Sequence, residues 1–144
     1  DLLYEAALAG VSVTLAVRSI CVLKNMGLPN LKILSVVDQF LEHSRIYHFR
    51  NGQENATDGI FYIGSADWMK RNLDRRVEVL TPIENQEHKQ TLVTILDLIA
   101  NDNTQAWEMN EDGTYTRLYK EKNKAVNFQL ELKRHYTLNY QQGI

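Results

Sequence analysis

One short stretch of the chain carries side chains that could handle phosphate. The segment FLEHSRIYHF, residues 40–49, places His43 two positions before Arg45. If this segment is a strand, alternate side chains share a face, so the imidazole and the guanidinium would lie side by side with Tyr47 and Phe49. Arginine matches phosphate oxygens and keeps its charge, whereas histidine exchanges a proton near neutral pH. The spacing therefore predicts a site that stabilises and protonates a phosphate oxygen.

A turn of small residues further along the chain could support this pair. Gly64 and Ala66 would let the backbone approach a ligand closely. Ser65 and Asp67 could fix the tautomer of His43 or receive a hydrogen bond. For Asp67 a second role stays open, which is to cap the turn.

Three more arginines are candidates for contact with an anion. Arg18 is expected at the C-terminal end of a strand over residues 11–17, and ligands of open α/β sheets gather at such ends. Arg75 and Arg76 belong to the alternating run NLDRR. Two interpretations of this pair stay open: phosphate contact, or a structural ion-pair network that holds a strand to the Trp68 loop.

These motifs resemble known families. HSR followed by GSAD is similar to the phospholipase-D-type pattern HxK then GSxN, with Arg45 in place of the lysine and Asp67 in place of the asparagine. The runs AGVSVTLAVRSICVL, FLEHSRIYHF and FYIGSADWMKRNLDRRVEVLTPI more specifically resemble the C-terminal catalytic domain of bacterial polyphosphate kinases of the first type. Trp107 and residues 112–115 also fit that family.

The resemblance implies a fold and an activity. The fold would be an α/β phospholipase-D-like mixed sheet flanked by helices, in a single domain over residues 1–144 that is a fragment of a larger enzyme. The activity would be reversible transfer of the terminal phosphate of ATP to polyphosphate, through a phosphohistidine formed in a preceding domain. His43 would then donate a proton and contact nucleotide phosphates, and Arg18 would contact ATP. Ser19 stands where the family motif has glycine.

The resemblance also implies ligands and partners. These are ATP or ADP, polyphosphate, the remaining domains of the same polypeptide and, in a homo-oligomer, further copies. Mg²⁺ would be bound mainly through the phosphates and the absent domain, because this sequence shows no carboxylate cluster that builds a metal cage, and no metal ligand is assigned. The isolated fragment is expected to be inactive.

Two alternatives stay open. A phospholipase-D-like hydrolase would use histidine itself as the nucleophile on a phosphodiester, but Arg45 and Asp67 depart from its pattern. A non-catalytic domain would bind nucleotide or polyphosphate without turnover, since the sequence holds one half-site.

Composition limits the other classes of protein. With 144 residues, 44% apolar and 24% charged, the chain is long enough for one domain. The residues given show no basic n-region and no apolar run of membrane-spanning length, so a protein that is neither secreted nor transmembrane is expected, and the single Cys21 fits a reducing compartment. A net charge of -2 argues against a nucleic-acid binder. The expected location is the cytoplasm, with peripheral membrane association left open.

Periodicity and turn residues predict the elements. Helices are expected over 2–8, over a short turn at 38–42, from the capping box TPIE at 81–84 to about residue 100, and over 125–136. Strands are expected over 11–17, 31–37, the His43 segment, 60–63 and 77–80, with a hairpin over 104–119. The apolar stripe of the long helix would be Leu92, Ile95, Leu96 and Ile99.

Several other side chains have ordinary structural interpretations. His48, His88 and His135 are expected to be structural or surface residues, and the predicted core aromatics are Tyr47, Phe49, Trp68 and Trp107. A solvated helix face, with a polyanion track as the alternative, is expected for Lys120, Lys122, Lys124, Lys133 and Arg134.

Overall fold

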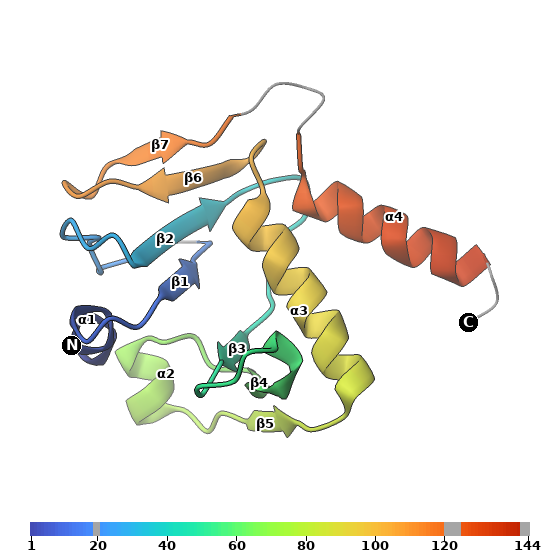
Figure 1. The fold of residues 1–144 in the computed structure, drawn as a ribbon, viewed down its shortest axis with the longest axis horizontal. Coiled ribbons are helices and arrows are strands. Elements are labelled where there is room, and N and C mark those ends of the chain that lie inside the picture. The colour runs from blue at the N-terminus through green and yellow to red at the C-terminus, as the bar shows by residue number, and fades with distance from the viewer. Residues whose placement is uncertain (19–20, 120–124, 142–144) are drawn as a thin grey trace. The chain divides into compact units, whose positions relative to one another are not determined.

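The computed structural model describes residues 1–18, 21–119 and 125–141, which form two compact units (Figure 1). Unit 1 comprises Asp1–Glu42 and Asp97–Ile144, and unit 2 comprises His43–Leu96. The expected α/β class, with a mixed sheet and flanking helices, is confirmed. The strands form two separate sheets, so the expected sheet is divided between the units.

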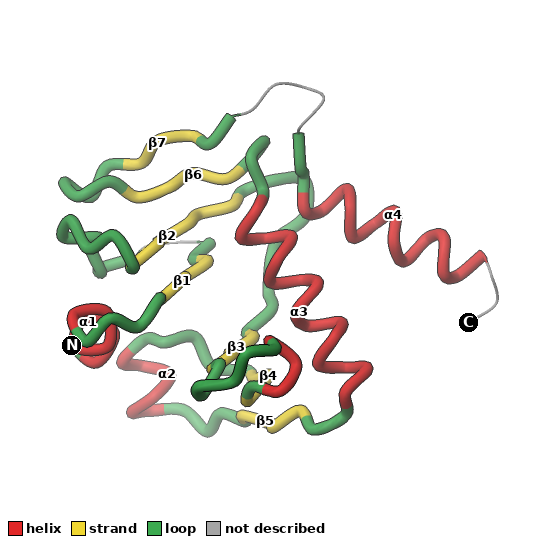
Figure 2. Tube along the Cα trace, viewed as in Figure 1, coloured by secondary structure: helices red, strands yellow, loops and turns green. Residues whose placement is uncertain are grey.

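Unit 1 is built on a four-stranded mixed sheet in the order β1-β2-β6-β7 (Figure 2). β1 and β2 are parallel, and the other two pairings are antiparallel. The hairpin expected over residues 104–119 is confirmed as β6 and β7. The elements of this unit are α1 Leu2–Leu8, β1 Val13–Ala16, β2 Leu31–Val36, β6 Ala106–Met109, β7 Tyr115–Arg117 and α4 Phe128–Gln141.

The core of unit 1 lies on both faces of the central strand β2. Leu31 and Ile33 point to one face and pack with Ala7 of α1, because alternate residues of a strand share a face. Val36 points to the other face and packs with Phe128 of α4. Because apolar side chains are buried on both faces, with half-buried Lys32 and Ser35 among them, the sequence LKILSV of β2 shows no strict alternation of apolar and polar residues.

The buried carboxylate of Asp102 fixes the turn between α3 and β6 and the start of α4. Its Oδ1 accepts hydrogen bonds from the backbone N–H groups of Thr104, Gln105 and Ala106 at 2.9, 2.8 and 3.1 Å. Its Oδ2 accepts one from the N–H of Phe128 at 2.9 Å. One side chain therefore satisfies four backbone donors that would otherwise be buried without partners.

Unit 2 is built on a three-stranded antiparallel sheet in the order β3-β4-β5. Its largest fully buried side chain is Phe61, on which the ring of His48 stacks with centroids 4.2 Å apart. His48 is thus a structural residue, as expected. The elements are β3 Ile46–Phe49, η1 Ala56–Asp58, β4 Ile60–Gly64, α2 Lys70–Arg75, β5 Leu80–Ile83 and the first part of α3 Gln86–Asn101.

Two expectations around His43 were wrong. Strand β3 begins at Ile46, so His43 and Arg45 precede the strand and do not share its face. Nη1 of Arg45 donates to the carbonyl of His43, while the backbone carbonyl of Arg45 accepts from the N–H of Gly64 at 3.1 Å just before the strand begins. Where a helical turn was predicted over residues 38–42, residues 39 and 40 form a bend and the others have no regular structure. Buried Gln129 binds both backbone groups of Phe40 there.

The prediction that a helix starts at the capping box of residues 81–84 was also wrong. Thr81 and Pro82 lie in β5, opposite Ile63 and Tyr62 of β4, so the strand expected over 77–80 is displaced toward the C-terminus. β5 is at the edge of its sheet. Pro82 is tolerated there because an edge strand pairs on one side only, so the N–H that proline lacks is not needed for a hydrogen bond to a second strand. The helix begins at Gln86, and Asn85 caps it by accepting from the N–H of His88 at 3.1 Å. The expected apolar stripe of α3 is half-buried.

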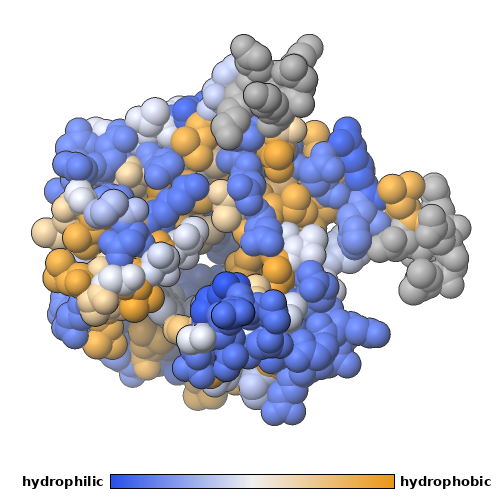
Figure 3. Space-filling model, in the orientation of Figure 1, coloured by the Kyte–Doolittle hydropathy of each residue, from blue (hydrophilic) through white to orange (hydrophobic). Residues whose placement is uncertain are grey.

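Three of the four predicted core aromatics are exposed. Trp68, Trp107 and Phe49 expose 57%, 41% and 50% of their surface, whereas Tyr47 is half-buried. Phe49 lies in β3 and Trp107 in β6, and both side chains are on a solvent-exposed side of their strand. Sequence periodicity alone cannot assign which side of a strand is buried. Apolar side chains remain at the surface, and orange areas stand among the blue on the visible face in Figure 3.

Candidate functional site

In unit 1, Arg18 follows the end of β1, as predicted. The N–H of Val17 extends the parallel pairing to the carbonyl of Leu34 at 2.7 Å, which leaves Arg18 at the carboxyl edge of the sheet. The half-buried guanidinium donates to the backbone carbonyl of Glu42. Gln129 also donates to the Glu42 carboxylate at 2.9 Å. Unit 1 therefore fixes the residue that precedes His43 in the chain.

In unit 2, His43 is exposed. Its carbonyl accepts a hydrogen bond from Nη1 of Arg45, so its backbone is held while its imidazole faces solvent. An accessible imidazole on a held backbone is what proton exchange with an external phosphate requires.

Arg45 is largely buried and paired with Asp67. Its side chain is 10% exposed, against 31% for Asp67. Nε and Nη2 of Arg45 both donate to Oδ1 of Asp67, at 3.0 and 2.6 Å. Asp67 therefore binds the guanidinium, which is a role that the sequence did not suggest for it.

Ser65 contacts a residue that the sequence analysis missed. Its hydroxyl donates to the carboxylate of Glu78 and accepts from the N–H of Val79 at 3.1 Å. The buried amide of Asn72 donates to the other oxygen of Glu78 at 2.9 Å. Hydrogen bonds from Ser65 and then Asn72 hold the pKa of Glu78 below its ordinary value. The run RRVEV gave no signal for this contact, because Ser65 is thirteen residues away.

Tyr47 holds the same turn from β3. Its hydroxyl donates to the carbonyl of Ala66 at 2.8 Å, and its ring stacks on Trp68 with centroids 5.4 Å apart. Burial raises the pKa of the Tyr47 hydroxyl. Arg45, Tyr47 and Glu78 thus bind three successive parts of the turn that carries Ser65 and Asp67.

Arg75 and Arg76 end α2 and follow it, and both are exposed. Within the described residues neither forms a salt bridge, so the ion-pair network considered from the sequence is not observed there. Both side chains are accessible to solvent.

The other predicted residues either take no part in these contacts or lie outside the residues that the structure describes. His88 and His135 are exposed on α3 and α4, as expected. On α4, Lys133 and Arg134 are exposed, and Arg134 pairs with Glu131 at 2.6 Å. Ser19 of the Arg18 motif and the lysines of the expected basic face, Lys120, Lys122 and Lys124, lie outside the described residues.

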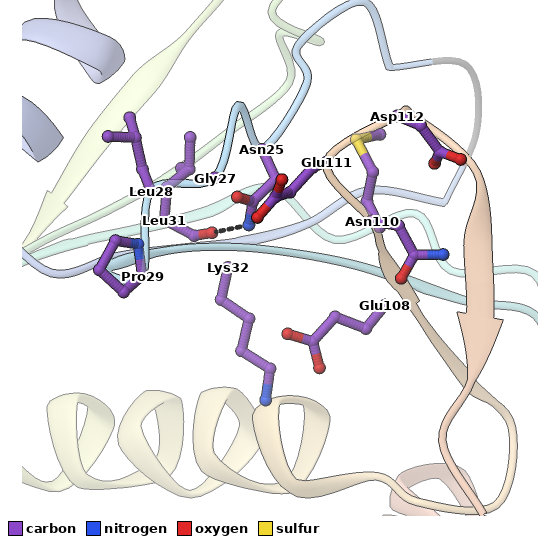
Figure 4. Close-up of a pocket in the computed structure, with 11 residues that line it drawn as sticks. Asn25, Gly27, Leu28, Pro29, Leu31, Lys32, Glu108, Asn110, Glu111 and Asp112 are labelled. Carbon is purple, nitrogen blue, oxygen red and sulfur yellow. Dashed lines mark hydrogen bonds between the residues drawn. The ribbon is translucent and has the colours of Figure 1, made fainter.

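A shallow pocket of about 670 Å³ in unit 1 contains none of the predicted site residues (Figure 4). Its polar lining includes Lys32 of β2 and Glu108 of β6, together with Glu111 and Asp112 of the turn before β7. Three carboxylates against one lysine would repel a polyanion. The pocket therefore does not belong to a phosphate site.

The described residues contain neither a cluster of metal ligands nor a membrane-spanning helix. Among them, no three or more His, Cys, Asp or Glu side chains are grouped so that they could bind a metal ion. Of the helices in the described ranges, none combines the length and the apolar character needed to cross a bilayer.

Comparison with known proteins identifies the family. The model of the family "Polyphosphate kinase C-terminal domain 2" matches residues 1–129. The polyphosphate kinase of Synechocystis sp. is 49% identical over 119 residues, which are 80% of this chain and 16% of that protein. The polyphosphate kinase of Erythrobacter litoralis is 50% identical over 124 residues, which are 82% of this chain and 17% of that protein.

A solved structure agrees with this result. The crystal structure of polyphosphate kinase from Porphyromonas gingivalis superposes with a TM-score of 0.87 and 32% identity, covering 97% of this chain and 21% of that one. The chain belongs to the polyphosphate kinase C-terminal domain 2 family, as the sequence motifs predicted. It spans 16% and 17% of the length of the two curated relatives named above.

Proposed function

We propose that the chain is the C-terminal catalytic part of an ATP:polyphosphate phosphotransferase, a fragment of a larger enzyme. The reaction moves the terminal phosphate of ATP reversibly to polyphosphate, through a phosphohistidine on a preceding domain. The observation that carries the proposal is the exposed imidazole of His43 on a backbone that Arg45 holds. Membership in a family of polyphosphate kinase domains supports it.

His43 and Arg18 have distinct roles in this proposal. Phosphoryl transfer depends mainly on positioning and on neutralising charge spread over the phosphate oxygens. His43 protonates a phosphate oxygen as the leaving group departs, and general acid catalysis of this kind contributes about 10² to 10⁴ in rate. Arg18, at the carboxyl edge of the parallel strands β1 and β2, contacts the nucleotide phosphates. Exposed Arg75 and Arg76 add positive charge for the polyphosphate chain.

The remaining components come with the substrates and the rest of the polypeptide. Mg²⁺ arrives on the phosphates, because the described residues offer no group of metal ligands. A preceding, phospholipase-D-like half supplies the nucleophilic histidine, and the enzyme works as a homo-oligomer in the cytoplasm or at a membrane surface. The 144-residue chain by itself is therefore expected to be inactive as a kinase.

The decisive experiment compares histidine variants of the full-length polypeptide that carries this chain. Transfer of radiolabel from ATP into an acid-labile product of mixed chain length is measured for the wild type and for His43→Ala. We expect the kcat of His43→Ala to fall by at least about 10². His88→Ala is the matched control, because His88 is also exposed but lies on α3, and it should keep full activity.

Two results would contradict the proposal. The first is near-normal synthesis by His43→Ala. The second is robust kinase activity from the 144-residue chain alone, which would show that the nucleophile does not lie elsewhere. Cleavage of a phosphodiester in the absence of nucleotide would favour the phospholipase-D-like hydrolase instead.

A further inference from the structure

We infer that Arg45 is a positioning residue that fixes the peptide of His43 and does not bind phosphate itself. The inference rests on the proposed role of His43. It assigns to Arg45 a role different from the one that the spacing of the two residues suggested.

The first step is the use of the guanidinium donors. Nε and Nη2 bind one oxygen of Asp67, and Nη1 binds the carbonyl of His43. All three nitrogens are therefore engaged by the protein, and the side chain is 10% exposed. These contacts use three of the five N–H donors. The Nε–Nη2 edge would have to release Asp67 before it could bind phosphate as a fork, and the low exposure of the side chain limits access to the two remaining N–H groups.

The second step is charge. The carboxylate of Asp67 is partly exposed and sits 2.6 Å from the Arg45 guanidinium. It neutralises this cation locally and would repel an approaching phosphate. Arg75 and Arg76, by contrast, are exposed, and within the described chain they form no salt bridge. Unit 2 thus has cations suited to an anion, and Arg45 is not one of them.

The third step is rigidity of the support. The turn that carries Asp67 is held by the hydroxyl of Tyr47, which binds the carbonyl of Ala66 at 2.8 Å. The N–H of Ser65 donates to the carbonyl of Val79, the residue before β5, at 3.0 Å. Arg45 bridges this held turn to the backbone of His43. A catalytic group held by a supported contact of this kind keeps the orientation that proton transfer needs.

The test separates positioning from phosphate binding by kinetics of the full-length polypeptide. Arg45→Lys keeps the positive charge but cannot bind Asp67 and the His43 carbonyl together. We expect kcat to fall by about 10²-fold with the KM for ATP unchanged, because a small misplacement of a catalytic group has an effect of that size. Asp67→Asn should lower kcat in the same way, and the double variant should be no worse than the worse single variant.

Three outcomes would overturn the inference. They are a raised KM for ATP or polyphosphate with kcat unchanged in Arg45→Lys, wild-type kinetics in that variant, or additive losses in the double variant. Trp68 fluorescence during urea unfolding shows whether each variant is folded. If Arg45→Lys does not fold, Asp67→Asn provides the test. A lower kcat with an unchanged KM would then support the inference, and a raised KM with an unchanged kcat would contradict it. Loss of activity in His43→Ala together with one of these outcomes refutes the inference alone, whereas an active His43→Ala refutes the proposed function.

Discussion

Within the described residues, the two units differ in the interactions found inside each of them. The buried apolar residues of unit 1 lie in and around its sheet and are Ala7, Leu31, Ile33, Leu34, Val36, Ala106, Met109 and Phe128. Among the residues of unit 2, Phe61 and Ala66 are the buried apolar ones in the described structure. Unit 2 instead contains the Arg45–Asp67 pair and the hydrogen bonds of Glu78.

This difference follows from what each kind of interaction does. Burial of apolar surface stabilises a fold without specifying direction, whereas a hydrogen bond or ion pair fixes the orientation of particular groups. The proposed acid, His43, belongs to unit 2, which buries fewer apolar side chains and whose turn at residues 65–67 is fixed by polar contacts. We therefore expect unit 1 to supply most of the stability and unit 2 to supply the orientation of the site.

The largest expected effect is in the core of unit 1. Phe128→Ala should lower the free energy of unfolding by about 3–5 kcal/mol, because it removes a fully buried ring that packs against Val36 and Ala106. Urea unfolding followed by the fluorescence of Trp107, in a Trp68→Phe background, reports on this unit. Leu130→Ala, at a residue of α4 that is 45% exposed, is the control in the same unit, and its cost should be about 1 kcal/mol or less. Equal losses from both variants would mean that the buried ring stabilises unit 1 no more than an exposed side chain does.

An intermediate effect is expected from acid on unit 2. The pKa of Glu78 is lowered in the folded chain, so its contribution to stability is present above its ordinary value of about 4.3 and is lost as pH falls through the lower, folded pKa. The urea midpoint reported by Trp68, in a Trp107→Phe background, should therefore fall below about pH 4.

Glu78→Gln sharpens this test, because a neutral amide cannot replace the carboxylate as acceptor of both hydrogen bonds. At pH 7 the urea midpoint of the variant should be lower than that of the wild type. As pH falls, the midpoint of the variant should decrease by less than the wild-type midpoint. Glu84→Gln, at an exposed glutamate, is the matched control and should follow the wild-type curve. An identical acid response of Glu78→Gln and the wild type would rule out this carboxylate as the source.

The smallest expected effect is at the surface of unit 1. Glu131 and Arg134 form an ion pair on α4 with exposed fractions of 39% and 70%. Arg134→Ala should change the free energy of unfolding by less than about 0.5 kcal/mol, because an exposed ion pair is screened by water and salt. Urea unfolding followed by Trp107 measures it. A loss as large as that of Phe128→Ala would mean that polar contacts stabilise unit 1 as much as its apolar core does.

The sequence alone determined the local elements whose signals are internal to a segment. The mostly apolar segment 31–37 predicted β2, the pattern of residues 104–119 predicted the hairpin of β6 and β7, and helix α1 covers the expected residues 2–8. The motifs around His43 were also sufficient to predict the family, because each motif is a contiguous run whose residue types can be compared directly with the family pattern.

The tertiary structure alone decided which partner each polar side chain has. Arg45 meets Asp67 across 22 residues, and Ser65 meets Glu78 across 13. Local rules also favoured a helix start at Thr81 and Pro82, but pairing with β4 makes this segment an edge strand. Hydrogen-bond partners and strand edges depend on segments distant in sequence, so periodicity and spacing could place the residues on the chain but could not place them against one another.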